Sequence, residues 1–108
     1  MDFLMGTYLN TIQGTLHATY RDIEANSEVV VTPFLNPDLS VLRLRIASEK
    51  SSWTTSNVKG VLWSTPTLLV KTCNSIIWIN VDPRDTESMS GVKDLLTFAD
   101  PLPANFAV

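Results

Sequence analysis

The sequence predicts a mainly β domain, an antiparallel sandwich or a rolled sheet, that ends in one C-terminal helix. Polar and apolar residues alternate with a period of two in several segments, which is typical of strands with one buried face. Seven short strand candidates follow one another between residues 7 and 81, and no helices alternate with them as βαβ units require. Helical spacing of apolar residues begins only after a turn at residues 82–85.

A chain of 108 residues has the usual size of one domain, so we treat residues 1–108 as a single β domain. Hydrophobic residues make up 44% of the chain and charged residues 18%. This is the composition of a folded protein whose surface is short of charge. Within the domain we expect an N-terminal arm or strand over residues 1–14, a helix over residues 86–98 and an extended tail over residues 100–108.

The first confident alternation covers residues 15–21 and predicts a strand. Its inward residues would be Leu16, Ala18 and Tyr20. Residues 7–12 would then be its hairpin partner across a turn at Gln13-Gly14. A helix over residues 7–23 is the alternative, because its spacing places on one face Leu9, Ile12, Leu16, Tyr20 and Ile23. Gly14 and the frequent threonines favour the strand over the helix.

Two further strands are predicted before residue 48. Residues 28–34 contain a β-branched run, and Pro33 should end this strand or place it at a sheet edge. A turn at residues 36–38 leads to the clearest strand of the chain, residues 39–47. Its inner face would consist of Leu42, Leu44 and Ile46, and its outer face would carry Arg43 and Arg45.

The remaining elements follow in order. Residues 48–57 are polar and predict a surface loop around Trp53. Three strands are then expected at residues 58–63, 67–73 and 75–81. The helix at 86–98 would be capped by Asp85, Thr86, Ser88 or Ser90 and would bury a stripe of Val92, Leu95, Leu96 and Ala99. Prolines prevent its continuation beyond residue 100.

Charge and targeting signals restrict the function. The formal net charge is -3, and without a concentrated basic patch nucleic-acid binding is disfavoured. Arg43 and Arg45 are the one candidate pair for a polar contact. The N-terminus lacks the basic residue of a signal peptide, no Asn lies in a glycosylation sequon, and no apolar run reaches the roughly 20 residues of a membrane span. We therefore expect a cytoplasmic, intracellular location and no transmembrane segment.

Candidate catalytic and metal-binding residues are few. His17 is the one histidine, and its place in the alternation predicts a solvated side chain. Cys73 is the one cysteine, which rules out an intramolecular disulfide, and a buried structural thiol is favoured over a nucleophile. Asp82, Asp85 and Glu87 fit a turn and helix cap better than a calcium loop. We expect no enzymatic activity, no metal and no cofactor.

The strongest functional signal is apolar. All three tryptophans lie within residues 53–78, and the strands at 67–73 and 75–81 are apolar on both faces. Such strands must be covered on both faces. The cover could be the C-terminal helix or a second subunit, and both remain open. The candidate interaction surface consists of Trp53, Trp63, Leu69, Ile76 and Trp78.

These observations predict a non-enzymatic interaction or structural protein. It would self-associate as a homodimer or larger oligomer through the apolar β surface and bind a protein partner. The composition also fits a virus-encoded accessory protein or virion component. The alternative is a carrier that holds a small hydrophobic or lipid ligand inside the β roll.

Overall fold

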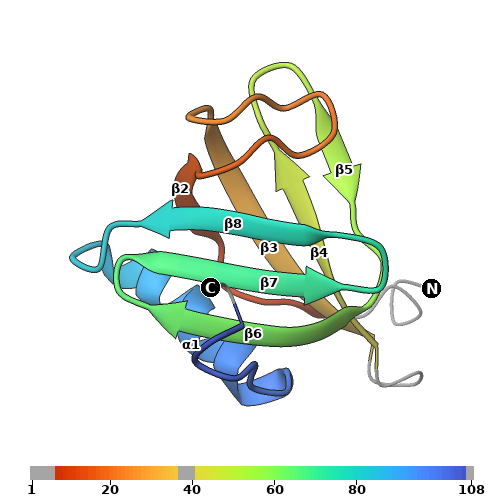
Figure 1. Ribbon diagram of the computed structural model, residues 1–108, viewed down its shortest axis with the longest axis vertical. Coiled ribbons are helices and arrows are strands. Elements are labelled where there is room, and N and C mark those ends of the chain that lie inside the picture. Colours follow the sequence, from red (N-terminus) through yellow and green to blue (C-terminus); the bar gives the residue numbers. More distant parts are fainter. Residues whose placement is uncertain (1–6, 37–40, 107–108) are drawn as a thin grey trace.

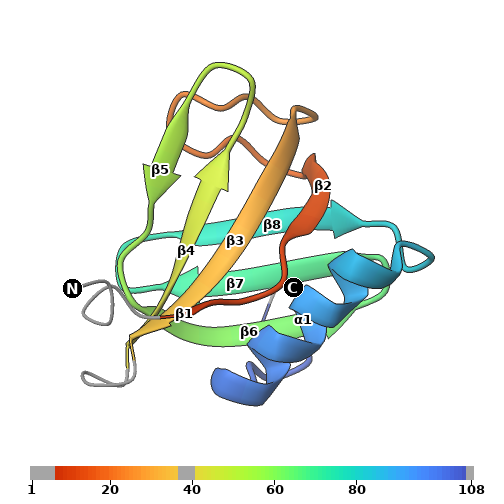
Figure 2. The same ribbon diagram turned by 180° about the vertical axis from the view of Figure 1, so that it is seen from behind.

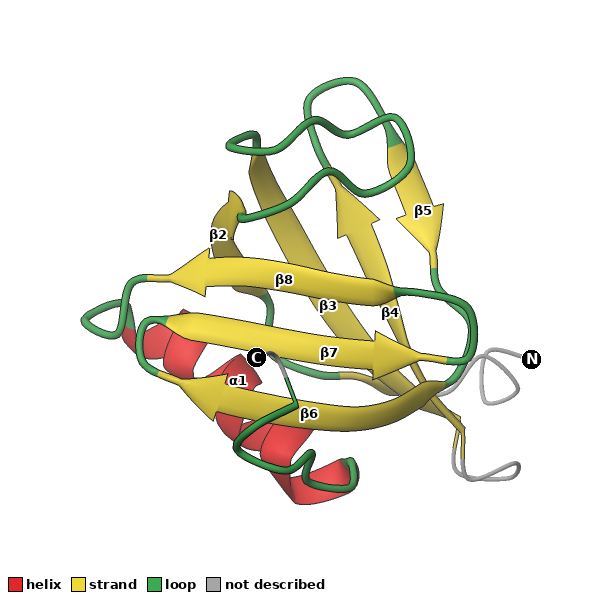
Figure 3. Ribbon diagram, viewed as in Figure 1, coloured by secondary structure: helices red, strands yellow, loops and turns green. Residues whose placement is uncertain are grey.

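The computed structural model describes residues 7–36 and 41–106, and these form one antiparallel sheet of eight strands with a single C-terminal helix (Figures 1 and 3). The predicted fold class is therefore confirmed. The strands are β1 (Thr7–Tyr8), β2 (Ile12–Leu16), β3 (Glu28–Asn36), β4 (Val41–Ala47), β5 (Ser52–Thr54), β6 (Val58–Ser64), β7 (Thr67–Thr72) and β8 (Ile76–Val81), and the helix is α1 (Thr86–Phe98).

The sheet is rolled into two layers that share one strand. Its order is β5-β4-β3-β2-β8-β7-β6, and β1 forms an additional pair with β3. Strands β2 to β5 and strands β6 to β8 are both meanders, and the layer of β6 to β8 crosses in front of β3 and β4 (Figure 1). Because β2 pairs with both β3 and β8, it joins the two layers into one sheet.

The join at β2 depends on a glycine. Gly14 lies opposite Val29 of β3 on one side and Val81 of β8 on the other. A Cβ at this position would contact the carbonyl oxygen of Asn80 and would lie 2.7 Å from Cγ2 of Ile79. The backbone of β2 therefore reaches β8 only because residue 14 has no side chain.

The core lies between the two layers. In β4 the alternation holds as predicted: Leu42, Leu44 and Ile46 are buried, and Arg43 and Arg45 are exposed. The cluster of buried apolar side chains comprises Ile12, Leu16, Tyr20, Ile23, Val29, Val31, Leu42, Leu44, Ile46, Val61, Leu68, Val70, Ile77, Ile79, Val81, Val92 and Leu95. Every strand from β2 to β8 except β5 contributes to it.

The helix has the range that the sequence predicts. Asp85 caps it by accepting hydrogen bonds from the backbone N–H of Ser88 at 3.4 Å and from its hydroxyl at 2.9 Å. Val92 and Leu95 are completely buried, but Leu96 is 42% exposed, so the predicted stripe was wrong at that residue. Among the described residues, no helix has the length and apolar content needed to cross a membrane.

The helix packs against β2, β3 and β6 at the open side of the roll (Figure 2). Contact with β2 is close, because a Cβ at Gly91 would lie 2.5 Å from Cγ1 of Ile12 and 2.6 Å from the carbonyl oxygen of Asn10. Ser88 strengthens this contact, since its hydroxyl accepts a hydrogen bond from the backbone N–H of Gln13 at 2.9 Å. The helix therefore completes the inner face of the roll.

The N-terminal prediction was wrong in its register. The strand ends at Leu16, and Gln13 and Gly14 lie inside β2, where the sequence predicted a turn. Residues 17–27 form a connection that includes neither a long strand nor a helix. Tyr20 and Ile23 are buried, and their backbones bond to each other in a tight turn. Their spacing fits both a strand and a helix. In the structure both side chains belong to this connection and cover one end of the core.

Two other predictions in this layer need correction. Trp53 does not lie in a loop, because residues 52–54 form the edge strand β5 and Trp53 pairs with Ile46. Pro33 neither ends β3 nor places it at an edge. Its carbonyl accepts a hydrogen bond from the N–H of Leu9, in the gap between β1 and β2, where the missing proline donor is not required. The predicted turn at residues 36–38 falls largely outside the described residues.

The C-terminal segment lies along the free edge of β6. The N–H of Val61 donates to the carbonyl of Asp100, and the N–H of Leu102 donates to the carbonyl of Val61, both at 2.9 Å. The Leu102 side chain lies over Gly60, where a Cβ would come within 2.5 Å of its Cδ2. Residues 100–102 therefore act as a short parallel extension of the sheet.

We expect Leu44→Ala to lower the free energy of unfolding by about 2–5 kcal/mol, because Leu44 is completely buried at the centre of the core. Urea denaturation monitored by circular dichroism measures this loss. Leu96→Ala on the exposed side of α1 is the control and should change stability by less than about 0.5 kcal/mol. Equal losses in the two variants would show that the register of β4 is incorrect.

Candidate functional site

A groove of about 1070 Å³ lies on the outside of the roll. Its floor includes the outward residues Gln13 of β2, Val30 of β3 and Ala47 of β4. Its walls come from residues 22–28, 47–50 and 80–85, which are three connections far apart in the sequence. We call this feature the acidic groove because of the side chains that line it.

The acidic groove concentrates the negative charge of the protein. The residues with carboxylates in its lining are Asp22, Glu24, Glu28, Glu49, Asp82 and Asp85. Lys50 is the one basic residue of the lining, so six carboxylates against one lysine give the groove a formal charge of -5. Since the whole chain carries -3, the residues outside the groove carry +2. The groove is therefore more negative than the rest of the molecule.

Hydrogen bonds fix one wall of the groove. Asp22 accepts from the Ser51 hydroxyl at 2.5 Å and from Nε1 of Trp53 at 2.8 Å. These two donors lower the pKa of Asp22, the Ser51 bond more than the Trp53 bond. Arg21 adopts a positive φ of 54° and holds its guanidinium 4.7 Å from the Trp53 ring. The connection after β2 is thus attached to β5.

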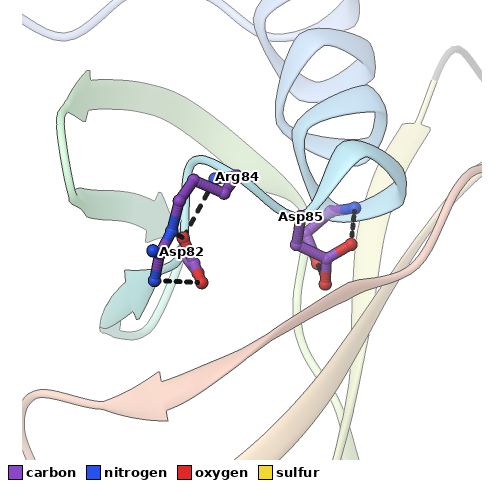
Figure 4. A network of polar contacts seen from close by, with 4 residues as sticks. Asp82, Arg84 and Asp85 are labelled. Carbon is purple, nitrogen blue, oxygen red and sulfur yellow. Dashed lines mark hydrogen bonds and ion pairs between the residues drawn. The ribbon is translucent and has the colours of Figure 1, made fainter.

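The opposite wall is a tight turn before α1 (Figure 4). The Asp82 carboxylate accepts from the backbone N–H of Arg84 at 2.9 Å and from its Nε at 3.1 Å. The Arg84 side chain is the main reason why the pKa of Asp82 is lowered. Asp85 turns toward Ser88 as the helix cap (Figure 4). This confirms the turn and helix cap that the sequence predicts.

Most of the groove's carboxylates form no ion pair with the part of the chain that the structure describes, although Asp22 and Asp85 accept the hydrogen bonds given above. Within residues 7–36 and 41–106, the one ion pair joins Arg84 to Asp82 at 3.1 Å. The other five carboxylates of the groove have no cationic group at ion-pair distance. Like charges gathered on one surface oppose folding, so this arrangement is more readily understood as a binding surface than as a source of stability.

The candidate polar contact, Arg43 and Arg45, lies on the same outward sheet face, with Arg45 one outward position from Ala47 on the groove floor and Arg43 one position farther away. Both side chains are exposed, and Arg43 donates a hydrogen bond from Nε to Oδ1 of Asn57 at 3.1 Å. Arg45 pairs across the ladder with Thr32, and Arg43 pairs with Phe34. Tyr8 adds a 58% exposed ring whose centroid is 5.6 Å from that of Phe34. This end of the face is basic and aromatic.

The structure brings together three of the five residues of the predicted apolar surface. Leu69 and Trp78 are opposite each other on the outward side of β7 and β8, and Ile76 on the same side is 51% exposed. Trp53 and Trp63 are partly buried and pack against the core. Leu69 is only 3% exposed, so the outer strip of Leu69, Ile76 and Trp78 is open to solvent mainly at Ile76, and α1, which packs on the inner side, contributes its buried residues to the core.

His17 and Cys73 both reach the surface. His17 is exposed, as expected, and its ring lies 4.6 Å from the ring of Trp78. Cys73 is exposed in the connection between β7 and β8, so the prediction of a buried thiol was wrong. Strand β7 ends at Thr72, so Cys73 lies beyond the strand and its side chain is not directed into the core. Among the described residues, no group of three His, Cys, Asp or Glu side chains could hold a metal ion.

Sequence reasoning did not identify the acidic groove. Its carboxylates come from separate connections, and none lies in a motif with a characteristic spacing. The net charge of -3 is the one related signal, and it does not reveal where the charge gathers. No protein-family model, curated protein or solved structure significantly matches the chain.

We expect Asp22→Asn to lower the melting temperature at neutral pH and to have little effect in acid. The pKa of Asp22 is lowered in the folded protein, so its charged form contributes stability above the ordinary pKa of 3.8, and this stability is lost as the pH falls through the lowered value. Thermal unfolding between about pH 2 and pH 7 measures the difference. A difference that stays constant with pH would contradict the charge-based explanation.

We expect the Cys73 thiol to react with an aromatic disulfide reagent in the native protein, because the residue is exposed. The reaction is followed by absorbance without denaturant. Cys73→Ser should abolish the signal and change the melting temperature little. A thiol that reacts only in urea would contradict the observed exposure.

Proposed function

We propose that this domain is a non-enzymatic interaction module that binds a basic segment of a protein partner in the acidic groove. The observation that carries the proposal is the set of five carboxylates around one groove of about 1070 Å³ that form no ion pair among the described residues. Opposite charges on a partner would compensate them, and charge complementarity of this kind gives specificity and fast association.

The composition of the groove suits lysine and arginine side chains. These side chains combine a charged head with an apolar stem. The stem could cover Val30, which is 38% exposed on the groove floor, while the head reaches the carboxylates of Glu28 and Glu49. A flexible acidic partner or a phosphate group would be repelled by the same walls.

The alternative of a hydrophobic-ligand carrier has less support. The space between the two layers is occupied by the apolar core cluster, and the walls of the groove are rich in carboxylates. An acyl chain in the groove would displace water from charged groups without compensating them, which is unfavourable.

Binding of a fluorescein-labelled peptide rich in lysine and arginine, measured by fluorescence anisotropy, tests the proposal. We expect the double variant Glu28→Gln/Glu49→Gln to bind about tenfold more weakly, because each exposed charge pair contributes up to about 1 kcal/mol. Added salt should weaken binding of the unaltered protein.

The matched control is Glu87→Gln/Asp100→Asn, which removes the same number of charges outside the groove. This control should bind the peptide like the unaltered protein. Equal weakening in both double variants would show that net charge alone attracts the peptide, and the proposed site would be rejected.

A further inference from the structure

The outward face of β3 and β4 has opposite charges at its two ends. On β3 the outward residues run from Glu28 through Val30 and Thr32 to Phe34, which pairs with Arg43. Six residues of strand separate Glu28 from Phe34, a distance of about 20 Å, and Arg45, which pairs with Thr32, lies between these two levels. Figure 2 shows this face, with β4 between β3 and β5.

Neither end is fully compensated by ion pairs among residues 7–36 and 41–106. Five carboxylates of the acidic groove form no ion pair, and Arg43 and Arg45 form none among the described residues. The Nε atom of Arg43 is bound to the neutral amide of Asn57. The acidic groove therefore keeps a net negative charge and the two arginines keep a positive charge, on one continuous face.

We infer that the basic partner of the acidic groove is a second copy of this chain. When two such faces meet in antiparallel orientation about a twofold axis, the basic end of each copy lies on the acidic end of the other. Arg43 and Arg45 of one copy then reach the groove beside Glu28 and Glu49 of its partner, and the same contact forms twice. An isologous interface requires this kind of self-complementary surface.

The remaining residues of the face fit the interior of such an interface. Val30, which is exposed on the floor of the acidic groove, lies one outward position from Glu28 and close to the position of the twofold axis. Tyr8 and Phe34 place two aromatic rings beside the arginines. Aromatic residues and arginine are the types most enriched in protein interfaces. The dimer thus combines a small apolar centre with two charged contacts.

This inference rests on the proposed function, because it assigns the occupant of the same groove. Sedimentation velocity of the full chain over a range of micromolar concentrations measures the oligomeric state. We expect a reversible dimer whose dissociation constant rises at least about tenfold when salt is raised from about 50 mM to about 500 mM, since screening weakens exposed charge pairs.

Charge reversal gives the decisive test. Arg43→Glu/Arg45→Glu and Glu28→Arg/Glu49→Arg should each be monomeric, because each makes both ends of the face alike. An equimolar mixture of the two variants should form heterodimers, since their reversed charges complement each other. Lys59→Glu/Lys93→Glu, which makes the same charge change at exposed sites of β6 and α1, is the control and should remain dimeric.

Three results would overturn the inference. One is a monomer at all concentrations and salt levels. Another is a dimer that survives both reversals. The third is a dimer that dissociates in Ile76→Asp, since that result would place the interface on the outer strip. Formation of heterodimers in the mixture also excludes misfolding as the cause of the monomers, because unfolded variants would not associate with each other.

Peptide binding separates this inference from the proposed function. The basic peptide is added to Arg43→Glu/Arg45→Glu, in which the groove is intact and not occupied by a second copy. If this variant binds the peptide but the unaltered chain is monomeric, the second copy is rejected and the proposed function stands. If the variant does not bind the peptide and the unaltered chain is monomeric, both are rejected.

Discussion

The architecture depends on the double pairing of β2. This five-residue strand bonds to β3 on one side and to β8 on the other, and without it the two meanders would be separate sheets. Gly14 permits the close approach to β8, and Ser88 ties the helix to the same strand. The walls of the acidic groove begin at these elements, so the position of the carboxylates follows from the way β2 holds the layers together.

Much of the fold could be predicted from local patterns. The alternation of β4 and the helical spacing after residue 85 both reflect burial on one face. They correctly predict a strand and a helix at these positions. The N-terminal region failed because Leu16, Tyr20 and Ile23 are buried for different reasons, one in a strand and two in a connection. The local pattern predicts a loop around Trp53 because its three-residue strand is surrounded by polar residues.

The candidate site was much less predictable than the fold. The sequence shows Arg43 and Arg45 together because they are alternate residues of one strand, whereas Glu28 and Glu49 meet in the groove only after β3 and β4 have paired. Likewise, when a strand is apolar on both faces, its sequence does not show whether its tryptophan faces the core or the outside. Trp63 packs on the core and Trp78 lies on the outward side, a difference set by register alone.

The short C-terminal extension has a consequence for solubility. An open sheet has two terminal strands, and unpaired backbone groups on such strands template the addition of further chains. In this sheet β5 is three residues long, and the central part of β6 is already bonded to residues 100–102. The segment after the helix therefore covers part of the edge of β6. Loss of these few residues would leave a longer hydrogen-bonding edge open to other molecules.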